Sequence, residues 1–270
     1  KGTSTTKPSP LLRSSIKIRK AGDEVEAEPG FMECDTVAHC GPTLKGEFFR
    51  SLTVTDVHTG WTENIALKNG AHRWVLEAMP IIEARLPFRL TGIDSDNGGE
   101  FINEALIGWA QERDLFFTRA RPYHSNDNAH VEQKNGDVVR RHAFHYRYDT
   151  AAELRLLNEL YALVRVRLNL FTGTTKAIGY RTNRNGKSVR VYDKPRTPHQ
   201  RLIDSGVLTA EKTAELAALF QSTNPAELTR QITAIQTRLI HLAAAKTAAI
   251  SAGVSRAKPG EARTHLSRAS

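Results

Sequence analysis

The sequence predicts a mixed α/β fold in which a five-stranded sheet is flanked by helices. Three strand-like runs follow one another from residue 31, and beyond them helical and strand-like segments alternate up to residue 170. Strands that follow one another directly favour an antiparallel meander, whereas strands separated by a helix favour parallel pairing. This order differs from the strict alternation of a doubly wound fold, so we expect a mixed sheet with helices on both faces.

The strands are predicted where short runs rich in β-branched and aromatic residues are bounded by turn residues. They are Phe31–Val37, Phe48–Asp56, Gly60–Leu67, Phe88–Ile93 and Leu115–Thr118. Helices are predicted where apolar residues recur at a spacing of three and four. They are Ala71–Leu86, Glu100–Glu112, Ala129–His145, Ala151–Leu170, Thr209–Phe220 and Pro225–Ile250. Pro80 lies inside the first helix and is expected to kink or divide it, because proline lacks the amide hydrogen that a helix interior needs.

Changes in composition divide the chain into four parts. They are a basic extended arm at 1–29, the core domain at 30–170, a basic hairpin and linker at 171–206, and a helical tail with a disordered end at 207–270. The hairpin is predicted because Asn185-Gly186, a dipeptide typical of a type I′ turn, stands between Ala177–Arg181 and Ser188–Tyr192. The sequence begins with Lys1 rather than Met, so we expect a fragment or a processed product.

Composition excludes several classes of protein. Two cysteines in 270 residues exclude a disulfide scaffold, and 25% charged residues exclude a membrane-embedded protein. Cys34 and Cys40 lack the paired spacing of a zinc finger. No cationic start followed by an apolar segment indicates a secretion signal, so we expect a cytoplasmic protein with no membrane partner.

The net charge of +9 is unevenly distributed along the chain. Residues 1–20 hold six cations and no acid, and residues 171–201 hold eight cations against one acid. Residues 30–150 hold 13 Lys and Arg against 17 Asp and Glu. A passive nucleic-acid binder would spread its cations over the contact face. The pattern instead favours flanks that hold a polyanion around a centre that needs carboxylates.

Three acids in that centre are placed where the predicted topology would bring them together. Asp35 lies inside the first strand, Asp96 directly follows the fourth, and Glu132 lies in the first turn of the helix that begins near Ala129. If the first and fourth strands are neighbours, Asp35 and Asp96 lie side by side, and a helix packed on that edge supplies Glu132. Asp94 is an alternative acid at the end of the fourth strand, although no Asn-Gly follows it.

Clustered carboxylates repel one another, by roughly 4 kcal/mol at ~4 Å and an effective dielectric near 20, unless a cation neutralises them. Oxygen-only ligands favour Mg²⁺ or Mn²⁺, and two such ions are suited to phosphoryl transfer. Singly, each acid has a structural reading as a turn residue or a helix-dipole partner. After Asp96, the glycines Gly98 and Gly99 allow a tight turn that a phosphate can approach closely.

The acids and their surroundings resemble the DDE catalytic core of retroviral integrases and bacterial insertion-sequence transposases. The matching segments are Asp35 in a strand, Asp96-Asn97-Gly98-Gly99-Glu100-Phe101, and Pro122 to Asn135 around Glu132. Thirty-five residues lie between Asp96 and Glu132, the spacing that names the family's motif. The resemblance covers roughly residues 1–205 and is strongest over 30–150.

The resemblance implies a ribonuclease H-like fold and a DNA transposase or integrase activity. It implies two Mg²⁺ ions, with Mn²⁺ as a substitute, held by Asp35 between both ions, Asp96 on one and Glu132 on the other. The reaction would be nicking at element ends followed by attack of the 3′-hydroxyl on target DNA. The implied partners are DNA ends, target DNA and further copies of the chain, at the bacterial nucleoid.

The chain departs from the family pattern where retroviral enzymes carry lysines after the glutamate, because Gly136 and Val139 stand there. Other cations are therefore our candidates for DNA contact. They are Arg121, Lys134, Arg140, Arg141, Arg181, Arg184, Lys187 and Arg190. No N-terminal helix-turn-helix or zinc domain is recognised, so end recognition is expected to lie outside this sequence.

Two other functions remain open at this stage. A ribonuclease H-type nuclease would cut RNA in hybrids, although that family usually has four acids rather than three with a helical glutamate. A non-catalytic, domesticated DNA-binding protein is the other alternative, and the intact acids argue against it.

Overall fold

The computed structural model describes residues 12, 14, 16–18, 27–120 and 129–257, which fold around one six-stranded sheet. The strands lie in the order β1-β6-β5-β2-β3-β4. Their bounds are β1 Lys17–Ile18, β2 Phe31–Ala38, β3 Arg50–Asp56, β4 Thr62–Leu67, β5 Gly92–Ser95 and β6 Phe116–Arg119. β2, β3 and β4 pair antiparallel, whereas β2, β5 and β6 pair parallel. The predicted mixed sheet with its antiparallel meander is confirmed.

The arm contributes a short sixth strand that the sequence does not reveal. Lys17 pairs with Thr118 and Ile18 with Arg119 in parallel register along β6. The side chain of Ile16 is buried beside them. This part of the arm packs because the outer edge of β6 offers backbone hydrogen-bonding groups that another extended segment satisfies. Most of the predicted arm, and the tail from residue 258, lie outside the described residues.

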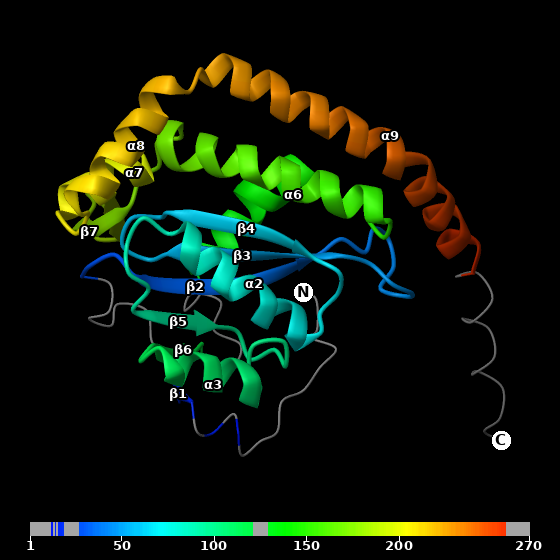
Figure 1. Cartoon of the computed structure of the whole chain (residues 1–270), viewed down its shortest axis with the longest axis horizontal. Helices are drawn as coiled ribbons and strands as arrows, with labels where there is room; N and C mark the ends of the chain where they lie inside the picture. Colours follow the sequence, from blue (N-terminus) through cyan, green and yellow to red (C-terminus); the bar gives the residue numbers. More distant parts are fainter. Residues whose placement is uncertain (1–11, 13, 15, 19–26, 121–128, 258–270) are drawn as a thin grey trace.

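Helices cover both faces of the sheet, as Figure 1 shows. α2 and α3 pack on one face, and the helices from α4 to α6 pack on the other. Their bounds are α2 His72–Arg85, α3 Glu104–Glu112, α4 Ala129–Lys134, η3 Asn135–Arg140, α5 Arg141–Ala143, α6 Ala151–Val166 and η4 Arg167–Phe171. Of the two effects predicted for Pro80, division of the helix is not seen, because α2 runs without interruption from His72 to Arg85. Pro80 lies on the exposed side of that helix, whose buried side is formed by Val75, Ala78, Met79 and Ile82.

The two faces of the sheet differ in chemistry. Because side chains alternate along a strand, Met32 and Cys34 face the apolar layer formed with α2 and α3. The opposite face is also buried but largely polar, and its residues include Glu33, Ser51, Thr53, Thr55, Asn64, Asp94 and Thr118. Hydrogen bonds within this layer satisfy the polar groups; Asn64 Nδ2 donates to Thr53 Oγ1 at 2.9 Å. Glu33 and Asp35 lie on this polar face, since they alternate with Met32 and Cys34.

The predicted hairpin is present, with β7 at Ala177–Thr182 and β8 at Ser188–Tyr192, but its turn is not type I′. Gly186 adopts a φ of 73°, whereas Asn185 has no positive φ, and type I′ requires both. Gly186 N–H donates to Asn183 O, and Asn183 N–H donates to Lys187 O. The loop therefore contains three residues, a length that favours a type I turn followed by a left-handed glycine.

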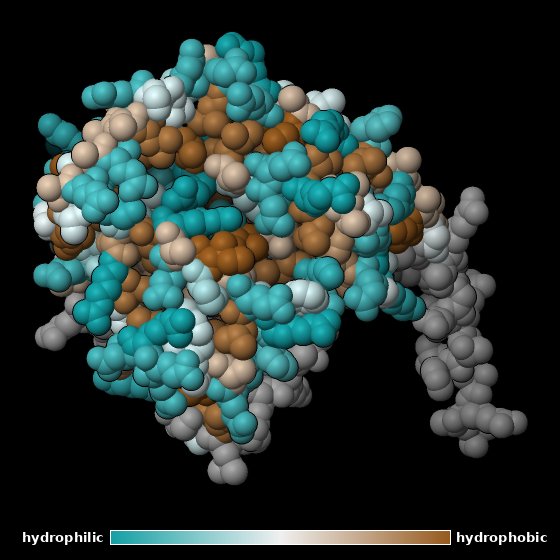
Figure 2. Space-filling view, in the orientation of Figure 1, coloured by the Kyte–Doolittle hydropathy of each residue, from teal (hydrophilic) through white to brown (hydrophobic). Residues whose placement is uncertain are grey.

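The C-terminal helices are α7 Pro198–Ser205, α8 Ala210–Ser222 and α9 Pro225–Ala257. α7 was not predicted, although Thr197 and Gln200 form a capping box at its start and Gly206 ends it in a left-handed conformation. α9 lies along α6, and Figure 2 shows apolar side chains gathered between the two helices. Among the described residues, none of the helices is long and apolar enough to cross a membrane.

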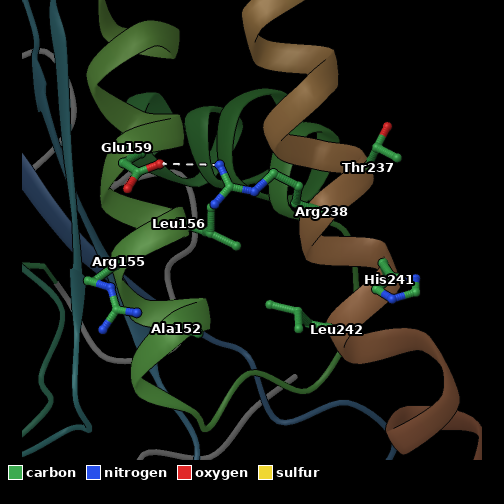
Figure 3. A pocket seen from close by; sticks show the side chains of 8 residues that line it. All are labelled: Ala152, Arg155, Leu156, Glu159, Thr237, Arg238, His241 and Leu242. Carbon is green, nitrogen blue, oxygen red and sulfur yellow. Dashed lines mark ion pairs between the residues drawn. The ribbon is translucent and has the colours of Figure 1, made fainter.

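The contact between α6 and α9 is partly packed and partly open. Leu239 is fully buried, and Lys246 Nζ pairs with Glu153 Oε1 at 2.8 Å. Beside these contacts, a pocket of about 470 Å³ lies between the helices, with Leu156 and Leu242 directed into it (Figure 3). The predicted apolar stripe of α9 therefore forms a seam with the core of the same chain.

Replacing Leu239 by alanine tests this seam. Leu239→Ala removes a side chain that is 0% exposed, so we expect a loss of about 2–5 kcal/mol in the free energy of unfolding. Leu242, three residues later and 43% exposed, is the matched control, and Leu242→Ala should cost less than about 1 kcal/mol. Urea denaturation measures both values. Equal losses would show that α9 is not held by this seam.

Candidate active site

Asp35 and Asp96 lie side by side, as the prediction required. β2 and β5 are parallel neighbours, and Cys34 pairs with Ser95, one residue before each aspartate. Asp35 therefore occupies β2, and Asp96 follows the last residue of β5 on the adjacent strand. The parallel pairing brings the two carboxylates together because the carboxyl ends of parallel strands meet at the same edge.

The electrostatics of the pair reflect this closeness. Burial and the neighbouring charge of Asp96 raise the pKa of Asp35 to about 7, although hydrogen bonds from Thr36 and Asn135 oppose the shift. Burial also raises the pKa of Asp96 to about 6, and the charge of Glu100 adds to this effect. Two half-buried carboxylates with raised pKa values are a site at which binding a cation relieves repulsion.

The turn after β5 holds Asp96 in place. Gly98 N–H donates to Asp96 Oδ1 at 2.9 Å, and Asn97 Nδ2 donates to Ala120 O at 2.9 Å, which ties the turn to the end of β6. A Cβ atom at Gly98 would lie 2.5 Å from Glu100 Oε2 and 2.9 Å from Asp96 Oδ1. A side chain at this position would therefore displace the carboxylates of Asp96 and Glu100, which glycine leaves in place.

Glu100 is a third acid of the cluster, which sequence reasoning treated only as the start of a helix. It is 4% exposed, and its Oε1 accepts hydrogen bonds from Arg50 Nη1 at 2.9 Å and Thr36 Oγ1 at 3.2 Å. Arg50 neutralises Glu100 and also lowers the pKa of Asp96. The signal in the sequence was the Asp-Asn-Gly-Gly-Glu segment, but the partner arginine lies on another strand and could not be found from it.

The helix that carries Glu132 is tied to the polar face of β2 by three hydrogen bonds. Val131 N–H donates to Glu33 Oε2 at 3.0 Å, and Asn135 Nδ2 donates to Asp35 Oδ2 at 2.6 Å. One turn further on, Arg140 Nη2 donates to Ala38 O at 3.0 Å. The helix thus follows β2 from Glu33 to its last residue.

The π-helical segment η3 allows Arg140 to reach β2 while Val131 and Asn135 also contact that strand. Val131 and Asn135 are four residues apart, so an α-helical turn places both on one side. Asn135 and Arg140 are five residues apart, and an α-helix would rotate Arg140 away from β2. A π-helical turn, with hydrogen bonds between residues five apart, brings them one above the other.

Glu132 does not close a three-acid group with the aspartates. Its side chain is exposed on α4, one residue after Val131. Within the described part of the chain, no three His, Cys, Asp or Glu side chains are grouped as metal ligands. The structure thus brings Asp35 and Asp96 together and attaches the helix of Glu132 to the same strand.

The donor set nevertheless suits a hard divalent cation. The carboxylates of Asp35 and Asp96 supply oxygen atoms, which Mg²⁺ and Mn²⁺ prefer. Beside them, Asn135 Oδ1 is buried and has no hydrogen-bond partner. An unsatisfied amide oxygen next to two mutually repelling carboxylates fits a positive charge in their midst.

The predicted DNA-contact residues have diverse environments. Lys134 is 7% exposed, and burial lowers its pKa to about 8. Arg140 is engaged with Ala38, whereas Arg141 is exposed and lies 3.7 Å from Asp137. The hairpin cations Arg181, Arg184, Lys187 and Arg190 are all exposed. Arg121 lies outside the described residues.

Comparisons with known proteins find one similar sequence and several structures of low similarity. No protein-family model matches the chain. The uncharacterized protein y4rM of Sinorhizobium fredii (strain NBRC 101917 / NGR234) is 36% identical over 190 residues, which is 70% of this chain. The chain spans about half of that protein's length, 54%.

Two solved structures are similar to the chain at low sequence identity. The catalytic core domain of BIV integrase aligns with a TM-score of 0.43 and 16% identity, over 65% of this chain and 95% of that one. The HTLV-2 integrase catalytic core domain in complex with magnesium aligns with a TM-score of 0.42 and 13% identity, over 55% and 92%. The function proposed below therefore rests on this chain's own side chains.

Glu33 is expected to hold the start of the glutamate helix. Glu33→Ala leaves the buried N–H of Val131 without its acceptor, which should cost about 1–3 kcal/mol of stability. Glu33→Gln keeps an oxygen acceptor and should restore most of it. Urea denaturation gives the stabilities, and amide hydrogen exchange over residues 129–140 should accelerate in the alanine variant alone. Equal exchange in both variants would contradict this role.

The raised pKa values of Asp35 and Asp96 predict that their ionisation lowers the free energy of unfolding of the metal-free protein. The folded-state pKa of each aspartate lies above the ordinary value near 3.9, so the folded state binds more protons and stability falls as pH rises from about 4 to 7. Asp96→Asn should therefore raise the Tm in EDTA at pH 7.5, by about 2–4 °C for each kcal/mol relieved, with the gain shrinking towards pH 4.

The matched control is Glu112→Gln, because the side chain of Glu112 is 78% exposed on α3. This variant should leave the Tm unchanged across the same pH range. An Asp96→Asn protein that is no more stable than the parent at pH 7.5 would show that the carboxylates do not repel one another.

Proposed function

We propose that this chain is the catalytic region of a DNA transposase or retroviral-type integrase with a ribonuclease H-like core. It nicks DNA at the ends of a mobile element and joins the freed 3′-hydroxyl to target DNA. The observation that carries the proposal is the pair of half-buried carboxylates beneath the helix of Glu132, Asp35 on β2 and Asp96 directly after the parallel neighbour β5. The 35 residues between Asp96 and Glu132 support the same reading.

Asp35, Asp96 and Glu132 would hold two Mg²⁺ ions, for which Mn²⁺ could substitute. Such ions, when bound, activate an attacking oxygen and stabilise a leaving oxygen in phosphoryl transfer. The chain's own residues provide the orientation for this chemistry. Asn135 holds the carboxylate of Asp35 by its amide, and the N–H of Gly98 holds Asp96. Arg50 pairs with Glu100 and lowers the pKa of Asp96, so it offsets part of the repulsion among these acids.

DNA is the proposed partner, and exposed cations are its proposed contacts. Arg141 is 71% exposed, and the hairpin cations Arg181, Arg184, Lys187 and Arg190 are exposed as well. The burial of Lys134 and the contact of Arg140 with Ala38 give these two residues a role inside the protein instead. Because two element ends must be joined to one target, we propose that the protein acts as a homo-oligomer on DNA, at the bacterial nucleoid.

Metal-dependent cleavage and joining of DNA test the proposal. The wild-type chain should nick supercoiled plasmid and join 3′-ends of DNA from the borders of its own element in Mg²⁺ or Mn²⁺, and EDTA should abolish both reactions. Asp96→Asn and Glu132→Gln should lower the rate by more than about 100-fold, because loss of even an indirect metal partner costs ~10–100-fold. Glu112→Gln, an exposed acid outside the site, is the matched control and should retain full activity.

Three outcomes would contradict the proposal. Equal activity of Asp96→Asn and the parent would remove the metal-site assignment. Cleavage of RNA–DNA hybrids without any action on DNA would favour a ribonuclease H-type nuclease. DNA binding without metal-dependent cleavage would favour a non-catalytic DNA-binding protein.

A further inference from the structure

The hairpin β7–β8 is a ribbon with little cover from the rest of the protein. It forms a separate two-stranded sheet, and nearly all of its side chains are exposed. Its base is fixed to the core by Lys176, whose Nζ donates to Val57 O and His58 O. A two-stranded hairpin is only marginally stable alone, so a ribbon held at one end is suited to contact something outside the chain.

One face of the ribbon carries a row of flat side chains. Tyr180 pairs directly with Arg190 across the strands, and Tyr192 lies two residues beyond Arg190 on the same face. Tyr180 is 69% exposed and Tyr192 is 53% exposed. Tyr180 and Tyr192 raise the pKa of the Arg190 guanidinium, which agrees with the three side chains sharing this face.

The positive charge of the ribbon limits the chemical classes of partner that it can bind. Arg181 lies on the opposite face, Arg184 lies in the loop, and Lys187 directly follows the loop. Within the described residues, no ion pair joins any of these cations to an acid, and the nearest acid in sequence, Asp193, is paired with Arg201. A second copy of this ribbon would bring like charges together. A polyanion that also offers flat apolar surfaces, namely nucleic acid with accessible bases, complements both features.

We propose that the face formed by Tyr180, Arg190 and Tyr192 binds unpaired nucleotides by stacking, while Arg184 and Lys187 bind the phosphates beside them. Aromatic side chains accept any base in this way because every base has a π-face, and a guanidinium group adds cation–π attraction. The proposal rests on the proposed function only for the identity of the partner as DNA.

The ribbon and the acids would contact different parts of a bound DNA strand. Thr53 of β3 lies opposite Asp35, and Val57, which holds the base of the ribbon, is four residues further along the chain. At roughly 3.3 Å per residue this separates the base of the ribbon from the position opposite Asp35 by about 13 Å. The base of the ribbon and the acids therefore lie at separate positions along β3.

Binding of oligothymidylate in EDTA tests the proposal without any catalysis. Fluorescence anisotropy is measured with a labelled oligothymidylate 15-mer and with an abasic 15-mer, which has the same phosphates and no bases. Tyr180→Leu and Tyr192→Leu should each weaken oligothymidylate binding by about fivefold or more and leave abasic binding unchanged. Tyr180→Phe and Tyr192→Phe keep the ring and should bind like the parent.

The proposed phosphate contacts are tested separately, by the salt dependence of binding. The double variant Arg184→Ala/Lys187→Ala should weaken binding to both oligomers and reduce the slope of log Kd against log salt by about 1.4, the value for two cations on a single strand. Asp96→Asn should bind oligothymidylate as the parent does, so loss of strand transfer and loss of stacking are separate results. Unchanged Tm values verify that the exposed substitutions leave the fold intact.

Two results would overturn the proposal. If the leucine variants bind oligothymidylate as tightly as the parent, the tyrosines do not stack on bases. If the parent binds the abasic and base-containing oligomers equally and prefers duplex DNA, the ribbon is a phosphate clamp without a base-binding face.

Discussion

The polar face of β2 is the constraint on which the candidate site depends. Glu33 is buried there and Asp35 nearly so, and buried polar groups must find hydrogen-bond partners. The α4–η3 helix supplies those partners through the amide of Val131 and the side chain of Asn135. The position of Glu132 relative to Asp35 therefore depends on these polar contacts as well as on the apolar packing of Val131 and Val138.

One face of the sheet provides apolar packing for stability, and the other carries the carboxylates of the candidate site. Met32 and Cys34 belong to the apolar layer with α2 and α3, which provides a rigid base. On the other face the carboxylates of Asp35 and Asp96 oppose one another, and only part of that repulsion is relieved by Asn135 and Gly98. A site that is strained in the absence of a cation needs such a base, because natural proteins tolerate local destabilisation where the surrounding fold is secure.

Prediction from the sequence succeeded where local pattern decided the outcome. Period-two and period-four apolar patterns located the strands and helices of the core to within a few residues, and the turn after Asp96 was expected from Gly98. Prediction from the sequence failed where contacts with a distant segment determine the environment of a side chain. Lys134 was expected to face DNA but is buried, and Arg140 is turned to Ala38 by a π-helical register that no local signal announced. α7 was missed even though its capping box was present, because its apolar pattern is short.

By itself the sequence determined the order of the elements and the spacing of Asp35, Asp96 and Glu132, because these depend on local periodicity and on residue identity. Only the tertiary structure decided that Glu100 joins the acids with Arg50 as its partner, and that Ile16 and β1 complete the sheet. It also decided which cations face solvent. The physical reason is that burial and pairing arise between segments tens of residues apart, and a local pattern carries no record of them.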